Sequence, residues 1–193
     1  MLENLDKYDV ILASKSPRRQ ELLAGMGVKF RVMTRDVVED YPSSLPAVDV
    51  PAFLSRKKAS AFEINELPEN CLVIASDTVV IIDNQILGKP KDTDDATRML
   101  RLLSGRTHKV VSGVTIKTKD VTETFSAVSD VTFNILNDNE IHFYIEKYRP
   151  FDKAGAYGVQ EWIGYIGVSA VKGSFYNVMG LPTQMLYQTL KKF

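Results

Sequence analysis

The chain has 193 residues, of which 45% are hydrophobic and 25% charged, a composition typical of globular proteins and unlike that of disordered or fibrous ones. Its 24 Lys and Arg residues are matched by 24 Asp and Glu residues, so no overall positive field is present to hold a nucleic-acid backbone. The single cysteine, Cys71, excludes an internal disulfide and a multi-cysteine zinc site, which favours a reducing compartment.

The amino-terminal residues give no sign of export or of membrane insertion. Residues 1–10 include Glu3, Asp6 and Asp9, and they lack the basic stretch and long apolar run of a secretion signal. The longest apolar runs, at residues 71–75 and 79–82, are far shorter than the ~20 residues that a spanning helix needs. We therefore expect a cytoplasmic protein with no membrane partner.

The first predicted elements are a strand, a loop and a helix. Residues 10–13 form a short apolar run suited to a buried strand, and apolar residues then recur at helical spacing. Ser16 is a suitable N-cap, Pro17 suits the first helical position, and Gly25 or Gly27 can end the helix. The amino terminus of such a helix can bind a phosphate-sized anion.

Strand and helix patterns continue along the chain without an internal repeat or a linker. Further strands are predicted at residues 30–34, on both sides of residues 83–84, at 110–117 and at 122–136. Further helices are predicted at residues 52–64, 92–103 and 182–192, with residues 41–51 as a surface loop, and a capping-box pattern at residues 137–140 opens another helix that runs to residue 147. This order predicts an α/β fold with a twisted mixed sheet and flanking helices, in a single domain over residues 1–193.

Residues 14–19 gather groups that a triphosphate requires. Ser14, Arg18 and Arg19 supply a hydroxyl and two cations next to the predicted helix amino terminus. An ordinary helix cap with two solvated arginines is the alternative. The buried strand that precedes this segment favours a ligand site.

Asp77 is the strongest single candidate for a metal ligand or a general base. Residues 72–82 are rich in β-branched side chains, but Ser76, Asp77 and Thr78 interrupt them, which places a carboxylate near a strand end in a buried segment. A carboxylate can hold magnesium or orient a water molecule. The alternative is a turn aspartate bonded to its local backbone. Glu39 is a second candidate, although a solvated acidic loop at residues 36–40 is the simpler interpretation.

Two lysines and two loops complete the candidate set. Lys57 and Lys58 lie on the apolar stripe of the predicted helix, where they either reach out to water or send one ammonium to a phosphate. Lys89 lies in a Gly-Lys-Pro turn that can close over phosphates or can be a plain surface turn. Residues 152–160 combine small residues with the Gln160 carboxamide, which suits a base edge; a glycine-containing strand with a bulge is the alternative.

Several chemistries have little support. His108 and His142 are isolated from each other and from Cys71, which disfavours a cysteine–histidine nucleophile and a histidine-rich zinc site. The sequence has neither a Gly-x-x-x-x-Gly-Lys-Ser/Thr run nor a Gly-x-Gly-x-x-Gly run after a strand. Phosphate binding would therefore use another scaffold.

Six separated motifs together resemble the Maf family of nucleotide pyrophosphatases. They occur in the family's order, from about residue 11 to residue 182, at residues 14–19, 75–79, 88–90, 103–105, 153–160 and 180–182. The resemblance implies a fold related to that of inosine triphosphate pyrophosphatases, with two lobes around a nucleotide cleft. It also implies a nucleoside triphosphate substrate and frequent homodimers.

The resemblance assigns roles to individual residues. Asp77 matches the position of the proton acceptor. Positions used for triphosphate and metal contacts match Ser14, Arg18, Arg19, Glu39, Lys58 and Lys89, with Mg²⁺ or Mn²⁺ as the divalent cation, and Asp77 and Glu39 as its expected ligands. A Lys58 that reaches a phosphate would explain a lysine on an apolar stripe.

The family resemblance also bears on the substrate. The positions of Arg18, Thr78 and Gln160 separate a branch that acts on dTTP and UTP from a branch that acts on 7-methyl-GTP, and this chain is similar to the first. Residues 161–171, with Trp162 and Tyr165, depart from the glycine-rich pattern expected after Gln160. Two alternatives remain: a pyrophosphatase for 7-methyl-GTP or other modified nucleotides, and a nucleotide-binding regulator of septum formation in cell division.

Overall fold

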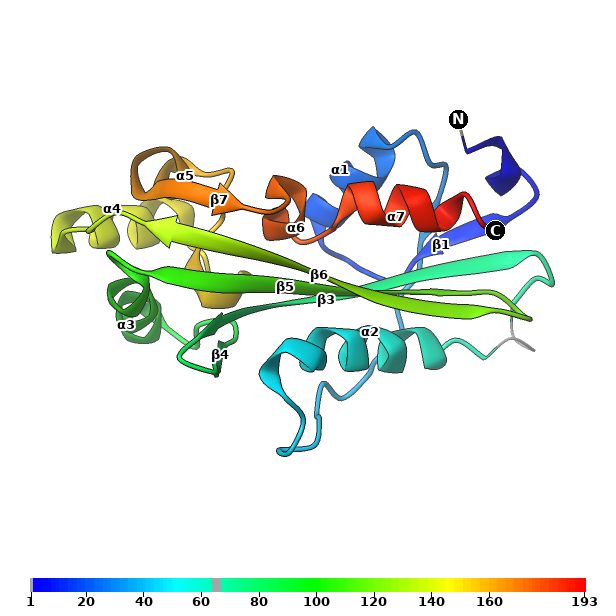
Figure 1. Ribbon diagram of the computed structural model, residues 1–193, viewed down its shortest axis with the longest axis horizontal. Coiled ribbons are helices and arrows are strands. Elements are labelled where there is room, and N and C mark those ends of the chain that lie inside the picture. Colours follow the sequence, from blue (N-terminus) through cyan, green and yellow to red (C-terminus); the bar gives the residue numbers. More distant parts are fainter. Residues whose placement is uncertain (1, 64–66) are drawn as a thin grey trace. The chain divides into compact units, whose positions relative to one another are not determined.

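A computed structural model describes residues 2–63 and 67–193, and the chain forms a mixed α/β fold around a seven-stranded sheet (Figure 1). The strand order is β2-β1-β3-β5-β6-β7, with β4 paired to β3. The strands are β1 (Asp9–Leu12), β2 (Arg31–Val32), β3 (Cys71–Ile82), β4 (Gln85–Leu87), β5 (Thr107–Lys117), β6 (Thr122–Phe133) and β7 (Val168–Lys172). The helices are α1 (Pro17–Gly25), α2 (Val50–Ser60), α3 (Thr93–Leu103), α4 (Asp138–Tyr148), α5 (Trp162–Gly167), α6 (Phe175–Met179) and α7 (Thr183–Leu190), with short 3-10 turns η1 (Glu3–Leu5), η2 (Ala47–Asp49) and η4 (Ala154–Ala156). The predicted fold class is confirmed.

The chain divides into two compact units, which β3, β5 and β6 connect. Unit 1 consists of residues 1–77, 112–127 and 180–193, and unit 2 consists of residues 78–111 and 128–179. In unit 1, β1 is parallel to both β2 and β3; α2 covers one face of the strands, and α1 and α7 cover the other (Figure 1). The hydroxyl of Tyr8 donates to the Phe193 carbonyl at 3.3 Å, which holds the two ends of the chain together.

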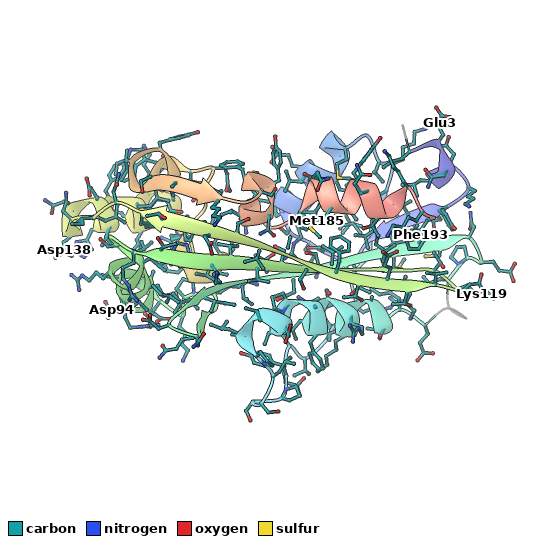
Figure 2. All side chains as sticks on the ribbon, viewed as in Figure 1. Glu3, Asp94, Lys119, Asp138, Met185 and Phe193 are labelled. Atoms are coloured by element: carbon teal, nitrogen blue, oxygen red, sulfur yellow. The ribbon has the colours of Figure 1, made fainter. Side chains whose placement is uncertain are left out.

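Unit 2 has a core of its own between its strands and α3, α4 and α5. It includes Leu100, Phe133, Ile141 and Ile163, all 2% exposed or less. The Asp92 side chain caps α3, and the capping box expected at residues 137–140 is confirmed on α4, where it is formed by Asn137 and Glu140. The acidic first turns of both helices face solvent, as Asp94 and Asp138 show in Figure 2.

The expected strand pair around Asp83 and Asn84 is confirmed as the β3–β4 hairpin. Both turn residues have positive φ angles, 51° and 61°, as a two-residue hairpin turn requires, and Asp and Asn tolerate this conformation well. Cys71 is a buried free thiol, as its sequence context suggests. The helices of the described residues are too short or too polar to cross a membrane.

Three predictions about local structure were wrong. Residues 76–78 do not interrupt a strand, because β3 is continuous and Asp77 lies in its interior rather than near its end. The helix predicted at 52–64 begins at Val50, since Pro51 fits its first turn, and ends at Ser60; residue 64 lies outside the described part. The strand predicted at 30–34 has only two residues. The alternative of a glycine-containing strand at residues 152–160 is excluded, because these residues form turns and η4 and Gly155 has a φ of 69° that a strand does not allow.

Candidate active site

The first part of the site lies where β1 ends and α1 begins. Ser14 is 8% exposed, and its Oγ accepts a hydrogen bond from the backbone N–H of Ser16 at 3.2 Å. Ser16 and Pro17 take the N-cap and first helical positions as predicted, but no side-chain capping bond is made by Ser16. The amino terminus of α1 therefore follows directly on a buried serine.

Arg19 is held by acceptors from three separate segments of unit 1. Its Nε donates to the carbonyl of Gly180 at 3.0 Å, and its Nη1 donates to the carbonyl of Ser76 at 2.8 Å and to Ser14 Oγ at 3.4 Å. Burial lowers the pKa of the Arg19 guanidinium, while the charges of Asp77 and Glu39 raise it. A guanidinium stays protonated under these conditions, so Arg19 is a fixed positive charge beside β3.

Two carboxylates share the ammonium group of Lys58. Lys58 Nζ lies 2.6 Å from Asp77 Oδ1 and 2.8 Å from Glu39 Oε1. The side chains of Lys58 and Asp77 are only 17% and 11% exposed, whereas that of Glu39 is 54% exposed. The buried charge inside β3 is thus compensated by a lysine from α2, as an ion in this environment requires.

The neighbouring lysine behaves differently. Lys57 pairs with Asp40, whose side chain is 72% exposed, and this contact lowers the pKa of the Asp40 carboxyl through a hydrogen bond from the ammonium. An exposed pair of this kind contributes little to stability. Of the two lysines on the apolar stripe, Lys57 therefore makes a surface ion pair and Lys58 reaches the buried carboxylate.

The donor set around Lys58 suits a divalent cation that is also held by a substrate. The described residues contain no group of three or more His, Cys, Asp or Glu side chains that could hold a metal ion. Asp77 and Glu39 nevertheless form a pair of carboxylates that meet at one positive charge. Mg²⁺ commonly uses one or two protein carboxylates when phosphate oxygens complete its coordination.

A sequence model of Maf-like proteins matches residues 9–193 of the chain. The chain belongs to the Maf family. It is 54% identical to a dTTP/UTP pyrophosphatase of Porphyromonas gingivalis strain W83 over 100% of this chain and 98% of that protein. It is also 53% identical to a dTTP/UTP pyrophosphatase of Bacteroides thetaiotaomicron over the full length of both, and 47% identical to one of Flavobacterium johnsoniae over 97% and 96%.

The fold agrees with this membership. The solved structure of the Staphylococcus aureus Ham1 protein aligns with a TM-score of 0.53 and 17% identity, and the alignment covers 94% of this chain and 99% of that one. At this identity the similarity concerns the fold alone. The mixed α/β fold of this Maf chain thus has a counterpart in the Ham1 structure.

Arg18 lies half-buried in α1 of unit 1, and the other candidate residues of this Maf chain belong to unit 2. Thr78 follows Asp77 in β3, Lys89 lies exposed between β4 and α3, and Gln160 lies in the turn before α5. The Lys89 and Gln160 segments are connected, because the N–H of Gly155 donates to the carbonyl of Gly88 at 3.0 Å. The structure thus brings two of the six sequence motifs together within unit 2.

A cavity of about 400 Å³ adjoins Gln160 in unit 2. Its lining includes Val159, Tyr165, Val171 and Phe175, and the Oε1 atom of Gln160 is buried without a hydrogen-bond partner among the described residues. Trp162 and Tyr165, which mark the divergent segment, fall on α5, which is followed by β7 at the edge of the sheet. Tyr165 of the divergent segment therefore lines the same cavity as Gln160.

The sequence did not reveal several groups that hold these residues. The carbonyls of Ser76 and Gly180 orient Arg19, but a backbone acceptor leaves no signature in a sequence; the Gly-Leu-Pro motif was the one available sign. Tyr144, buried in α4, makes hydrogen bonds to the segment that carries Gln160. Its spacing in the helix indicates only a core position.

His108 and Tyr157 form a second buried anchor of that segment. His108 Nε2 lies 2.7 Å from the Tyr157 hydroxyl, His108 is 2% exposed, and burial lowers the pKa of its imidazole from 6.5 to about 4. The imidazole takes up a proton near pH 6.5 in the unfolded chain but only near pH 4 in the folded chain. The free energy of unfolding therefore falls as the pH drops between these values. We expect this group to remove up to about 3 kcal/mol from the free energy of unfolding by pH 4.

The measurement is urea unfolding at pH 7 and at pH 4.5 for the wild type and for His108→Gln. The variant keeps a polar partner for Tyr157 and cannot take up the proton. Several aspartates with lowered pKa values weaken the fold below about pH 4 in both proteins, so the comparison isolates the histidine. An equal loss of stability in the two proteins would show that His108 is not responsible.

Proposed function

We propose that this chain hydrolyses dTTP and UTP to the nucleoside monophosphate and pyrophosphate. Three relatives that match it over nearly their full length at 47–54% identity carry the name dTTP/UTP pyrophosphatase. The chain is then a hydrolase of nucleotide metabolism that cleaves a phosphoric anhydride. Arg18, Thr78 and Gln160, which match the positions typical of the dTTP and UTP branch, would select the base and sugar.

The observation that carries the proposal is the pair of carboxylates on Lys58. Asp77 is buried inside β3, and its Oδ1 is fixed by the ammonium at 2.6 Å, beside the cationic Arg19 and the hydroxyl of Ser14. A buried carboxylate is unfavourable for folding, and β3 would be better packed with another valine. A water-activating role explains why a carboxylate is present at this position.

In the proposed reaction Asp77 accepts a proton from the water that attacks the α-phosphorus. Lys58 holds one oxygen of this carboxylate, which limits its rotation and leaves it aligned for the proton transfer. Arg18, Arg19, Lys58 and Lys89 would neutralise charge on the phosphates, and Ser14 would donate a hydrogen bond to them. Groups that are fixed before the reaction stabilise such charge most effectively, and Arg19 meets this condition through its three bonds.

Asp77 and Glu39 would also hold a divalent cation, Mg²⁺ or Mn²⁺. When bound, such a cation supplies positive charge to the phosphate oxygens and orients the attacking water. The two carboxylates fit this task because they already share one cation, the Lys58 ammonium. The partial exposure of Glu39 leaves this carboxylate open to solvent and ligands.

The decisive experiment is a substrate panel with purified protein and Mg²⁺ or Mn²⁺. It contains dTTP, UTP, CTP, GTP and 7-methyl-GTP, and the released anion is identified as pyrophosphate or as phosphate. We expect pyrophosphate from dTTP and UTP. A preference for 7-methyl-GTP would contradict the assignment from Arg18, Thr78 and Gln160, and nucleotide binding without turnover would favour a regulatory role.

A further inference from the structure

Gln160 occupies the centre of a tight turn, residues 158–161. The N–H of Glu161 donates to the carbonyl of Gly158 at 3.0 Å, which closes the turn and leaves Val159 and Gln160 between its ends. The Gln160 Oε1 atom has no hydrogen-bond partner among the described residues. The direction of this side chain is therefore set by the backbone of the turn and by packing.

Both ends of this turn bind one hydroxyl group, that of Tyr144 in α4. The N–H of Gly158 donates to Tyr144 Oη at 3.0 Å, and the Tyr144 O–H donates in turn to the carboxylate of Glu161. Tyr144 is fully buried, and burial together with the Glu161 carboxylate raises the pKa of its phenol. The phenol thus stays protonated and keeps its role as donor to Glu161 at neutral pH.

Lys153 completes the arrangement from the other side. Its Nζ lies 3.1 Å from Glu161 Oε1 and 2.8 Å from Asp152 Oδ1, with its side chain only 9% exposed. This ammonium balances the partly buried Glu161 carboxylate, which accepts the hydrogen bond of the Tyr144 hydroxyl. Tyr144, Glu161 and Lys153 form what we call the Tyr144 cluster.

The backbone of the turn is pressed against the Tyr144 cluster and against α5. A Cβ atom on Gly158 would lie 2.9 Å from Glu161 Cδ and 3.1 Å from Lys153 Cε. A Cβ atom on Gly164 would lie 1.8 Å from the carbonyl oxygen of Val159, a distance that no packing allows. The turn is thus enclosed on two sides, so we expect a change in the cluster to alter the position of Gln160.

We infer that Tyr144, Glu161 and Lys153 are positioning residues for base selection, because they fix the turn that presents Gln160 to the nucleotide. The inference rests on the proposed function of Gln160 as a base-reading residue. It assigns a specificity role to a tyrosine and an ion pair that act through the turn of residues 158–161. Their loss should weaken binding of the base and leave the chemistry at the phosphate intact.

The test compares steady-state kinetics of the wild type, Tyr144→Phe and Glu161→Gln on dTTP and dCTP. We expect KM for dTTP to rise about threefold to tenfold, as the loss of one or two buried hydrogen bonds implies, with kcat within about twofold and a lower preference for dTTP over dCTP. Inhibition by inorganic tripolyphosphate should be unchanged in both variants and weakened in Lys58→Ala. Tyr148→Phe is the matched control, since this tyrosine stacks on Tyr144 at 5.2 Å in the same helix and should behave as wild type.

A double variant separates positioning from general destabilisation. If the Tyr144 cluster acts through Gln160, Tyr144→Phe should have no further effect on selectivity in a Gln160→Ala background. The inference would be overturned if Tyr144→Phe lowered selectivity equally in the wild-type and Gln160→Ala backgrounds. Unchanged KM and selectivity in both folded cluster variants would overturn it as well. If Gln160→Ala itself leaves selectivity unchanged, the proposed role of Gln160 fails and the inference fails with it; a wild type without pyrophosphatase activity overturns the proposed function as a whole.

Discussion

Asp77→Asn is expected to lower kcat for dTTP about 100-fold to 10,000-fold, the range typical of a lost general base. Asparagine has nearly the same shape and can still accept a hydrogen bond from Lys58, so β3 and its contact with α2 should persist. It cannot accept the proton of the attacking water at neutral pH. Binding of a non-hydrolysable dTTP analogue, measured by calorimetry, should change far less than turnover.

Asp40→Asn provides the matched control for this variant. It removes the carboxylate of the other lysine–aspartate pair, Lys57–Asp40, which lies on the surface. Activity and stability should stay close to wild type, because exposed pairs contribute little. If Asp77→Asn retained a substantial part of kcat, Asp77 would not be the proton acceptor, and Glu39 would become the first candidate to examine.

Gly113→Ala is expected to destabilise the fold by about 3 kcal/mol or more, at or above the upper end of the range for overpacked cores. A Cβ atom at this position in β5 would lie 2.2 Å from the carbonyl carbon of Pro51 and 2.3 Å from the amide nitrogen of Ala52. These are backbone atoms in the first turn of α2, so no side chain can rotate away. Either the strand or the helix must move.

The consequence extends to the site, because α2 carries Lys58. A shift of α2 would lengthen the contact of Lys58 with Asp77, so residual folded protein should also be less active. Thermal unfolding should show a midpoint lowered by about 6 °C or more. Gly25→Ala is the control, since a Cβ atom there meets nothing within 4 Å and the residue lies in α1, where alanine is favoured. An unchanged midpoint for Gly113→Ala would show that β5 and α2 are not in the close contact described.

The sequence by itself determined the elements whose signals are local. The Asn137–Glu140 capping box and the Asp83–Asn84 turn act within a few residues, so their positions followed from the residue types alone. Six motifs in a fixed order likewise led to the Maf family, which the match over residues 9–193 confirms. Length, charge balance and the single cysteine had already excluded several other classes of protein.

Only the tertiary structure decided which charged and polar groups pair with one another. The sequence suggested that Asp77 interrupts a strand, because a charge is expensive there; the strand continues because Lys58, 19 residues earlier in the chain, supplies the opposite charge. The tertiary structure also distinguished Lys58 from Lys57, which lie on the same apolar stripe in the sequence. Apart from the Gly-Leu-Pro motif, nothing in the sequence indicated the backbone acceptors of Arg19 or the Tyr144 hydroxyl at the 158–161 turn, because contacts between distant segments depend on the packing of the whole chain and not on local residue order.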